Sequence, residues 1–169
     1  RTAGQVNIVL IPAGAAGSEK ENVEQLQLGI LDMAITGIPS FVEPRLDLLA
    51  VPFVFKDIDH VNRCSAGIVG RRMAEWMSER DVIVLDYYGR LGTVVASTRP
   101  VKEPKDWQGL KVRISETEPF IDFYRGFGAS PTALPFGEEY TALQTGVVDG
   151  VRTLLDLVYD SGFHEHAKY

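Results

Sequence analysis

The sequence predicts an α/β fold with a largely parallel sheet. Short apolar segments typical of strands alternate with segments whose apolar residues recur at helical spacing, and glycine and proline residues separate the two kinds. With 45% hydrophobic and 24% charged residues, the chain of 169 residues can build a core. Its length fits one domain or two small ones.

The first predicted elements are a strand, a turn and a helix. Residues 6–11 are mostly apolar and β-branched, which is the pattern of a buried strand. Ser18 and Glu21, three residues apart, form a capping box that begins a helix. Residues 31–35 are a second short predicted strand. The helix between these strands has an apolar stripe formed by Val23, Leu26 and Ile30.

A long predicted helix dominates the next part of the chain. Residues 46–55 are apolar but interrupted by Pro52, so we expect an irregular buried segment there. Apolar residues recur at helical spacing over about residues 59–79 and predict one continuous helix. Residues 82–85 and 93–96 are two further predicted strands.

Arg113 belongs to a predicted strand whose end is suited to ligand binding. Within residues 107–114, apolar and basic residues alternate with a period of two. Arg113 lies near the carboxyl end of this strand, where open α/β sheets usually bind their ligands. We hypothesise that its guanidinium binds a small carboxylate. The alternatives are a solvated surface arginine or a structural ion pair.

The last part of the chain continues the alternation of elements. An amphipathic helix is followed by an extended segment at residues 129–136, a short helix at 138–145 and a strand with a turn at 147–151. Phe136 is a candidate pocket wall or core residue. Arg90, which follows Gly89 at a strand end, is a candidate second pocket cation. The amphipathic helix has an apolar face formed by Phe120, Phe123, Tyr124 and Phe127.

Charge and hydropathy exclude several kinds of partner. The formal net charge is −6 and there is no run of basic residues, so nucleic acid is not expected as a partner. No apolar run approaches the roughly 18 residues of a membrane span, so we expect no membrane insertion. No signal peptide is present, but the sequence starts at Arg1 rather than Met, and we expect that it is trimmed.

The sequence contains no catalytic or metal-binding constellation. His164 and His166 are two residues apart, a spacing that separates them around a helix, and there is no H-E-x-x-H motif. There is no nucleophile elbow, and the apolar spacing around Cys64 favours a core thiol. Glu138 and Glu139 diverge on a helix, so they make a poor acid–base pair. We therefore expect no metal and no cofactor.

Four motifs resemble one family of transport proteins. They are L-G-I-L-D-M-A-I at residues 28–35, A-V-P-F-V-F at 50–55, D-W-Q-G-L-K-V-R-I at 106–114, and G-A-S-P-T-A-L-P-F-G-E-E-Y-T-A-L-Q-T-G-V-V-D-G at 128–150. In this order they closely resemble the solute-binding proteins of tripartite ATP-independent periplasmic (TRAP) transporters, the DctP-like family. The resemblance covers nearly the whole chain.

The resemblance implies a two-lobed periplasmic-binding-protein fold, similar to type II, that closes by hinge motion on an organic acid. Residues 1–90 would form the first lobe and residues 91–169 the second. Compared with the family, both ends are expected to be truncated. The first strand and helix, and the C-terminal part with its lobe-bridging helix, would be missing.

The same resemblance implies a periplasmic protein, without enzymatic activity, that delivers a mono- or dicarboxylate to membrane permease subunits. An enzyme or a sensory domain that binds a carboxylate in the same cleft is the alternative.

The resemblance also implies roles for single residues. Arg113 matches the arginine that forms a salt bridge with the ligand carboxylate, and Phe136 matches a position that often faces the ligand. A second family arginine falls in register at Thr93, so either Arg90 replaces it through a shifted turn or the pocket has one such arginine. Two further departures concern the family motif Q-E-N-P and an acid of sialic-acid-binding relatives.

Where many members read Q-E-N-P, this chain reads V-R-T-L. Thr153 thus takes the place of a ligand-contacting asparagine, and Arg152 reverses a charge. Gly37 stands where sialic-acid-binding relatives have an acidic residue. A simpler mono- or dicarboxylate is therefore expected rather than a sugar acid.

Overall fold

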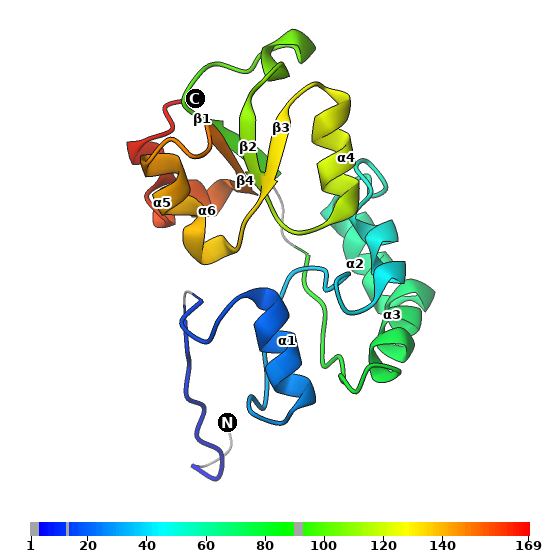
Figure 1. Ribbon diagram of the computed structural model, residues 1–169. Helices are drawn as coiled ribbons and strands as arrows, with labels where there is room; N and C mark the ends of the chain where they lie inside the picture. The colour runs from blue at the N-terminus through cyan, green and yellow to red at the C-terminus, as the bar shows by residue number, and fades with distance from the viewer. Residues whose placement is uncertain (1–3, 13, 90–92) are drawn as a thin grey trace.

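The computed structural model describes residues 4–12, 14–89 and 93–169. Its elements form two groups that follow one another in the sequence and lie side by side (Figure 1), and the ring of Phe53 in the first group contacts that of Phe123 in the second. The first group is helical. It contains α1 (Glu19–Gln27), the 3₁₀ helix η1 (Pro44–Ala50), α2 (Ile58–Ala66) and α3 (Ile68–Ser78).

The second group is built on a four-stranded sheet. Its strands are β1 (Thr93–Ser97), β2 (Lys111–Ile114), β3 (Ser130–Ala133) and β4 (Gly150–Leu154). Its helices are α4 (Glu118–Gly126), α5 (Glu139–Gln144) and α6 (Leu155–Asp160), with the 3₁₀ helices η2 (Pro104–Trp107), η3 (Phe136–Glu138) and η4 (Phe163–Glu165).

The sheet is largely parallel, as predicted. Its strand order is β1-β4-β2-β3, in which β2 is parallel to both β3 and β4, while β1 is antiparallel to β4. Helix α4 lies on one face of the sheet and helices α5 and α6 lie on the other (Figure 1). Because both faces are covered, the central strand β2 is buried on both sides. Val112, Arg113 and Ile114 are all buried.

Two apolar clusters fill the space between the sheet and these helices. On the α4 face, the buried residues are Leu110, Val112, Ile114, Tyr124 and Ala129. On the α5–α6 face they are Ala96, Ala142, Leu143, Val148, Val151, Phe163 and Ala167. The predicted amphipathic helix is confirmed as α4, and its first aromatic residues pack on the first cluster.

Several predictions for the first group are wrong. Residues 6–11, 31–35 and 82–85 form no strands, and their apolar side chains are largely exposed, with Leu10 at 83% and Ile83 at 81%. An apolar, β-branched segment becomes a strand only when another strand can accept and donate its backbone hydrogen bonds. The residues that the structure describes supply no such neighbour to these three segments.

Two further differences have local causes. The expected single helix at residues 59–79 is two helices, α2 and α3, because Gly67 ends one and begins the other with a non-helical backbone conformation. The expected buried segment at residues 46–55 is buried only in η1. Phe53, beyond η1, is 90% exposed and its φ is positive. The capping box of Ser18 and Glu21 is confirmed at the start of α1.

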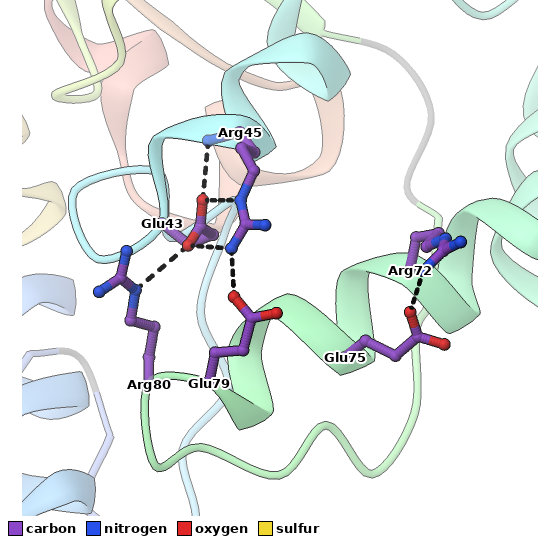
Figure 2. A network of polar contacts seen from close by, with 6 residues as sticks. All are labelled: Glu43, Arg45, Arg72, Glu75, Glu79 and Arg80. Atoms are coloured by element: carbon purple, nitrogen blue, oxygen red, sulfur yellow. Dashed lines mark hydrogen bonds and ion pairs between the residues drawn. The ribbon is translucent and has the colours of Figure 1, made fainter.

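A charged network ties η1 to the end of α3 (Figure 2). Glu43 is 1% exposed and accepts hydrogen bonds from the backbone and guanidinium of Arg45 and from the Arg80 side chain. Arg45 also pairs with Glu79 at 2.6 Å. The Arg45 hydrogen bonds are the main reason why the pKa of Glu43 falls from 4.5 to about 2. The ionised form of Glu43 therefore stabilises this corner of the first group.

We expect Glu43→Gln to lower the midpoint of thermal unfolding at neutral pH by several degrees. Because the folded-state pKa of Glu43 is depressed to about 2 from 4.5, its contribution is complete above about pH 4.5 and is lost as the pH falls toward 2. The difference between wild type and variant should therefore shrink across that window in thermal melts followed by circular dichroism. Glu75→Gln, which removes the exposed partner of Arg72 (Figure 2), is the control. Equal effects of the two variants would contradict the prediction.

Candidate carboxylate-binding site

Strand β2 places Arg113 near the carboxyl end of the three parallel strands. Arg113 is the residue before the last of β2 and lies opposite Thr132 of β3 and Val151 of β4. Side chains that lie opposite each other share a face of the sheet. The side chain of Arg113 therefore lies on the face covered by α5 and α6, and Arg113 is 6% exposed.

The guanidinium of Arg113 is fixed by one carbonyl and one carboxylate. Nε donates a hydrogen bond of 2.8 Å to the main-chain oxygen of Leu134, and Nη2 donates to the same oxygen. Nη1 pairs with the carboxylate of Glu139. A guanidinium has five N–H groups, so these three contacts leave two without a partner among the described residues. The structural ion pair considered as an alternative is thus present, and donors remain for a ligand.

Glu139 is the residue that the sequence did not reveal as part of this site. It begins α5 and is 1% exposed. Burial raises its pKa from 4.5 to about 7, and the charge of Arg113 opposes that shift. Burial likewise lowers the pKa of Arg113, and the charge of Glu139 opposes it. Glu138, which precedes Glu139 in the chain, is exposed, so the two carboxylates diverge as predicted.

A second arginine reaches the same end of the sheet from the other face. Arg152 lies opposite Val95 of β1 and stacks on the ring of Phe120, with its guanidinium carbon 3.8 Å from the ring centroid. Burial lowers the pKa of Arg152, and so does the positive charge of Arg113, whereas Glu139 raises it. The charges of Arg113, Glu139 and Arg152 therefore interact with one another.

A cleft of about 450 Å³ opens next to these charges, between α1 and the sheet group. Glu116 lines it and also raises the pKa of Arg113, as does Glu19 of α1. The cleft thus lies within electrostatic range of Arg113, which does not itself line it, and is walled by both groups of elements. Its lining consists of Ser18, Lys20, Glu21, Glu24, Glu116, Pro135 and Glu138.

The structure places the predicted site residues differently. Thr153 is 6% exposed and shares the face of Arg113, because it is two residues beyond Val151 on β4. Phe136 is 40% exposed and lies between two residues that line the cleft. Thr93 instead lines a separate cavity of about 280 Å³ beneath α4. Arg90 lies outside the described residues.

The backbone of Gly37 is in contact with a glutamate side chain of α1. Its backbone N–H donates to Oε1 of Glu19 at 3.2 Å, and a Cβ at position 37 would lie 3.4 Å from Oε2 of the same residue. A carboxylate is therefore present beside position 37 even though the residue there is glycine. That the glycine at position 37 disfavours a sugar acid stays a prediction.

Other chemistry finds no support among the described residues. Within residues 4–12, 14–89 and 93–169, no group of three or more His, Cys, Asp or Glu side chains is arranged to hold a metal ion. Over the same part of the chain, no helix is both long and apolar enough to cross a membrane.

The fold and site define an α/β binding protein with an arginine at the ligand end of its sheet. The family described as "Bacterial extracellular solute-binding protein, family 7" matches residues 1–169, and the chain belongs to this family, DctP. The predicted family and fold class are confirmed. The family and its structural neighbours are transport proteins that bind solutes, not enzymes.

Individual relatives support the same assignment. The chain is 31% identical over 172 residues to the 2,3-diketo-L-gulonate-binding periplasmic protein YiaO of Escherichia coli, covering 100% of this chain and 52% of the relative. A TRAP periplasmic solute-binding protein from Sulfitobacter sp. NAS-14.1, solved with bound β-D-galacturonate, superimposes with a TM-score of 0.94 at 29% identity, over 99% of this chain and 57% of that one.

A third similar structure contains a smaller acid. It is a TRAP periplasmic solute-binding protein from Sulfurospirillum deleyianum with bound succinate, with a TM-score of 0.92 and 31% identity over 97% of this chain and 54% of that one. The chain thus spans about half the length of the relatives it matches.

Proposed function

We propose that the complete protein captures an organic acid anion in the cleft between residues 1–90 and 91–169. In this proposal, it then delivers the anion to the membrane permease subunits of a TRAP transporter. Arg113 binds the ligand carboxylate, and Thr153 and Phe136 contact the rest of the ligand. The compartment is the periplasm, in keeping with the extracellular family and with the periplasmic proteins among the relatives.

One observation carries the proposal. Arg113 lies at the carboxyl end of the parallel strands, beside a cleft, and retains two N–H donors after its contacts with Leu134 and Glu139. The Leu134 carbonyl holds the guanidinium in place before a ligand arrives, so little side-chain freedom is lost on binding. Charge-assisted hydrogen bonds contribute about 1.5–3 kcal/mol each. A micromolar complex requires about 8 kcal/mol, so closure around the ligand supplies the remainder.

A thermal-shift screen of the full-length protein against organic acids tests this function. We expect a raised unfolding midpoint with at least one carboxylate, and no shift with the corresponding neutral alcohol or methyl ester. Isothermal titration then measures the dissociation constant. The proposal is wrong if no carboxylate in a panel of hydroxy acids, keto acids, uronates and dicarboxylates stabilises the protein. Chemical conversion of a bound acid would instead indicate an enzyme.

A further inference from the structure

Arg152 is a partly buried cation without an acidic partner. Among the described residues, no carboxylate lies within ion-pairing distance of its guanidinium and no side-chain hydrogen bond of Arg152 is formed, although it is in electrostatic range of Glu139. Removing a charge from water is costly unless an opposite charge compensates for it. The contact that the structure does provide is the face of the Phe120 ring, at 3.8 Å.

The contact with Phe120 engages the face of the Arg152 guanidinium. A guanidinium that lies flat on an aromatic ring uses its face for the cation–π contact, while its N–H groups point outward in the plane of the group. Those N–H groups match the two oxygens of a carboxylate. Because no described residue accepts a hydrogen bond from the Arg152 side chain, these N–H groups remain available to an anion.

Arg152 also lies close to Arg113 in the sheet. Arg152 is in β4, which runs parallel to β2, and it lies one register position beyond the pair formed by Arg113 and Val151. Its charge acts on the same cluster as that of Arg113. The two arginines thus belong to adjacent parallel strands near their carboxyl ends, the region where α/β folds bind ligands, with Arg113 on one face of the sheet and Arg152 on the other.

The sum of charges at this end of the sheet limits what can bind. Arg113 and Arg152 contribute two positive charges, and Glu139, in the ionised form that pairs with Arg113, contributes one negative charge, which leaves one net positive charge. The adjoining cleft is lined by the exposed carboxylates of Glu21, Glu24, Glu116 and Glu138 against one cation, Lys20. A single ligand carboxylate would neutralise the cluster, whereas a second one would lie in a negative field.

We infer that Arg152, held on Phe120, is a second residue that binds the ligand carboxylate, and that with Glu139 it makes the site selective for monocarboxylates over dicarboxylates. This inference rests on the proposed function and narrows its ligand class. Hydroxyl groups on the remainder of the ligand would be favoured, because they can donate hydrogen bonds to the carboxylates that line the cleft.

The role of Arg152 is tested by calorimetry on the full-length protein with D-gluconate and D-glucuronate. We expect Arg152→Gln to weaken binding of the acid that the wild type binds by roughly 10- to 100-fold, the equivalent of one lost charge-assisted contact. Phe120→Leu, which keeps an apolar side chain but removes the ring, should weaken binding less. Arg125→Gln is the matched control, because Arg125 is exposed on the same helix α4 and should not change affinity.

Selectivity is tested with D-gluconate and D-glucarate, which differ in one terminal carboxylate. The wild type should bind D-gluconate at least tenfold more tightly. In Glu139→Gln the cluster carries two net positive charges, so this preference should shrink, whereas Glu75→Gln, which removes an exposed carboxylate of α3 away from the cleft, should change it much less. Unfolding midpoints of the unliganded variants show whether each is folded.

The outcomes separate this inference from the proposed function. Unchanged affinity in a folded Arg152→Gln variant, or tighter binding of D-glucarate by the wild type, overturns the inference while acid binding itself stands. Binding of neither monocarboxylate by the wild type also overturns it. Failure of the whole panel of acids in the thermal-shift screen removes the proposed function as well.

Discussion

Replacement of Arg113 by lysine in the full-length protein is expected to weaken binding of the organic acid at least about tenfold without unfolding the protein. A lysine ammonium keeps the positive charge that Glu139 requires, so the buried carboxylate retains a partner. It cannot, however, donate to the Leu134 carbonyl through two N–H groups, pair with Glu139 and still offer two donors to a ligand. A loss of 1.4 kcal/mol, about one charge-assisted hydrogen bond, is a tenfold loss of affinity.

Titration calorimetry on the acid with the largest thermal shift measures this effect. Arg99→Lys is a matched control, because Arg99 is exposed and also donates to a main-chain carbonyl, that of Gln108, at 3.0 Å. We expect the control to leave affinity unchanged. An Arg113→Lys variant that binds as tightly as the wild type would show that Arg113 serves only its ion pair with Glu139.

Gly70→Ala is expected to destabilise the first group by about 3 kcal/mol or more. A Cβ at position 70 would lie 1.7 Å from the carbonyl oxygen of Ser65, which belongs to the last turn of α2. That oxygen is part of the backbone and cannot rotate away, so α2 and α3 must separate. The loss greatly exceeds the gain in helix propensity, about 1 kcal/mol, that alanine brings over glycine.

Chemical denaturation of Gly70→Ala, of a control variant and of the wild type measures the free energy of unfolding. Gly126→Ala is the control, because Gly126 is also helical, at the end of α4, and a Cβ there meets no atom within 4 Å. This variant should be neutral or up to about 1 kcal/mol more stable. Equal stability of the two variants would mean that the helices α2 and α3 pack less closely at Gly70 than the structure shows.

Features that depend on residues close together in the sequence were predictable. The capping box at Ser18 needs only Glu21, and the strand that contains Arg113 follows from its own alternation, so both are found as predicted. The burial of both faces of that strand was not predicted. The parallel sheet followed from the alternation of elements in the second group. The family followed from motifs that span nearly the whole chain.

Features that depend on distant residues were not predictable in this way. The segments at residues 6–11, 31–35 and 82–85 have strand patterns, but a pattern does not reveal whether another strand lies alongside. The partnership of Arg113 with Glu139 requires that α5 begins beside the end of β2, which only the topology shows. The stack of Arg152 on Phe120 likewise requires that α4 covers the correct face of the sheet.

The carbonyl of Leu134 has a consequence for how this protein could change its ligand. Because a main-chain atom fixes the orientation of Arg113, that orientation does not depend on the side chain at position 134 or on those of the residues around the cleft. In the proposed site, mutations at positions 136 and 153 can therefore accumulate, or be introduced by design, while the arginine that anchors a carboxylate remains in place. A binding protein built this way can diverge toward new acids through single substitutions, each intermediate still retaining affinity for acids as a class.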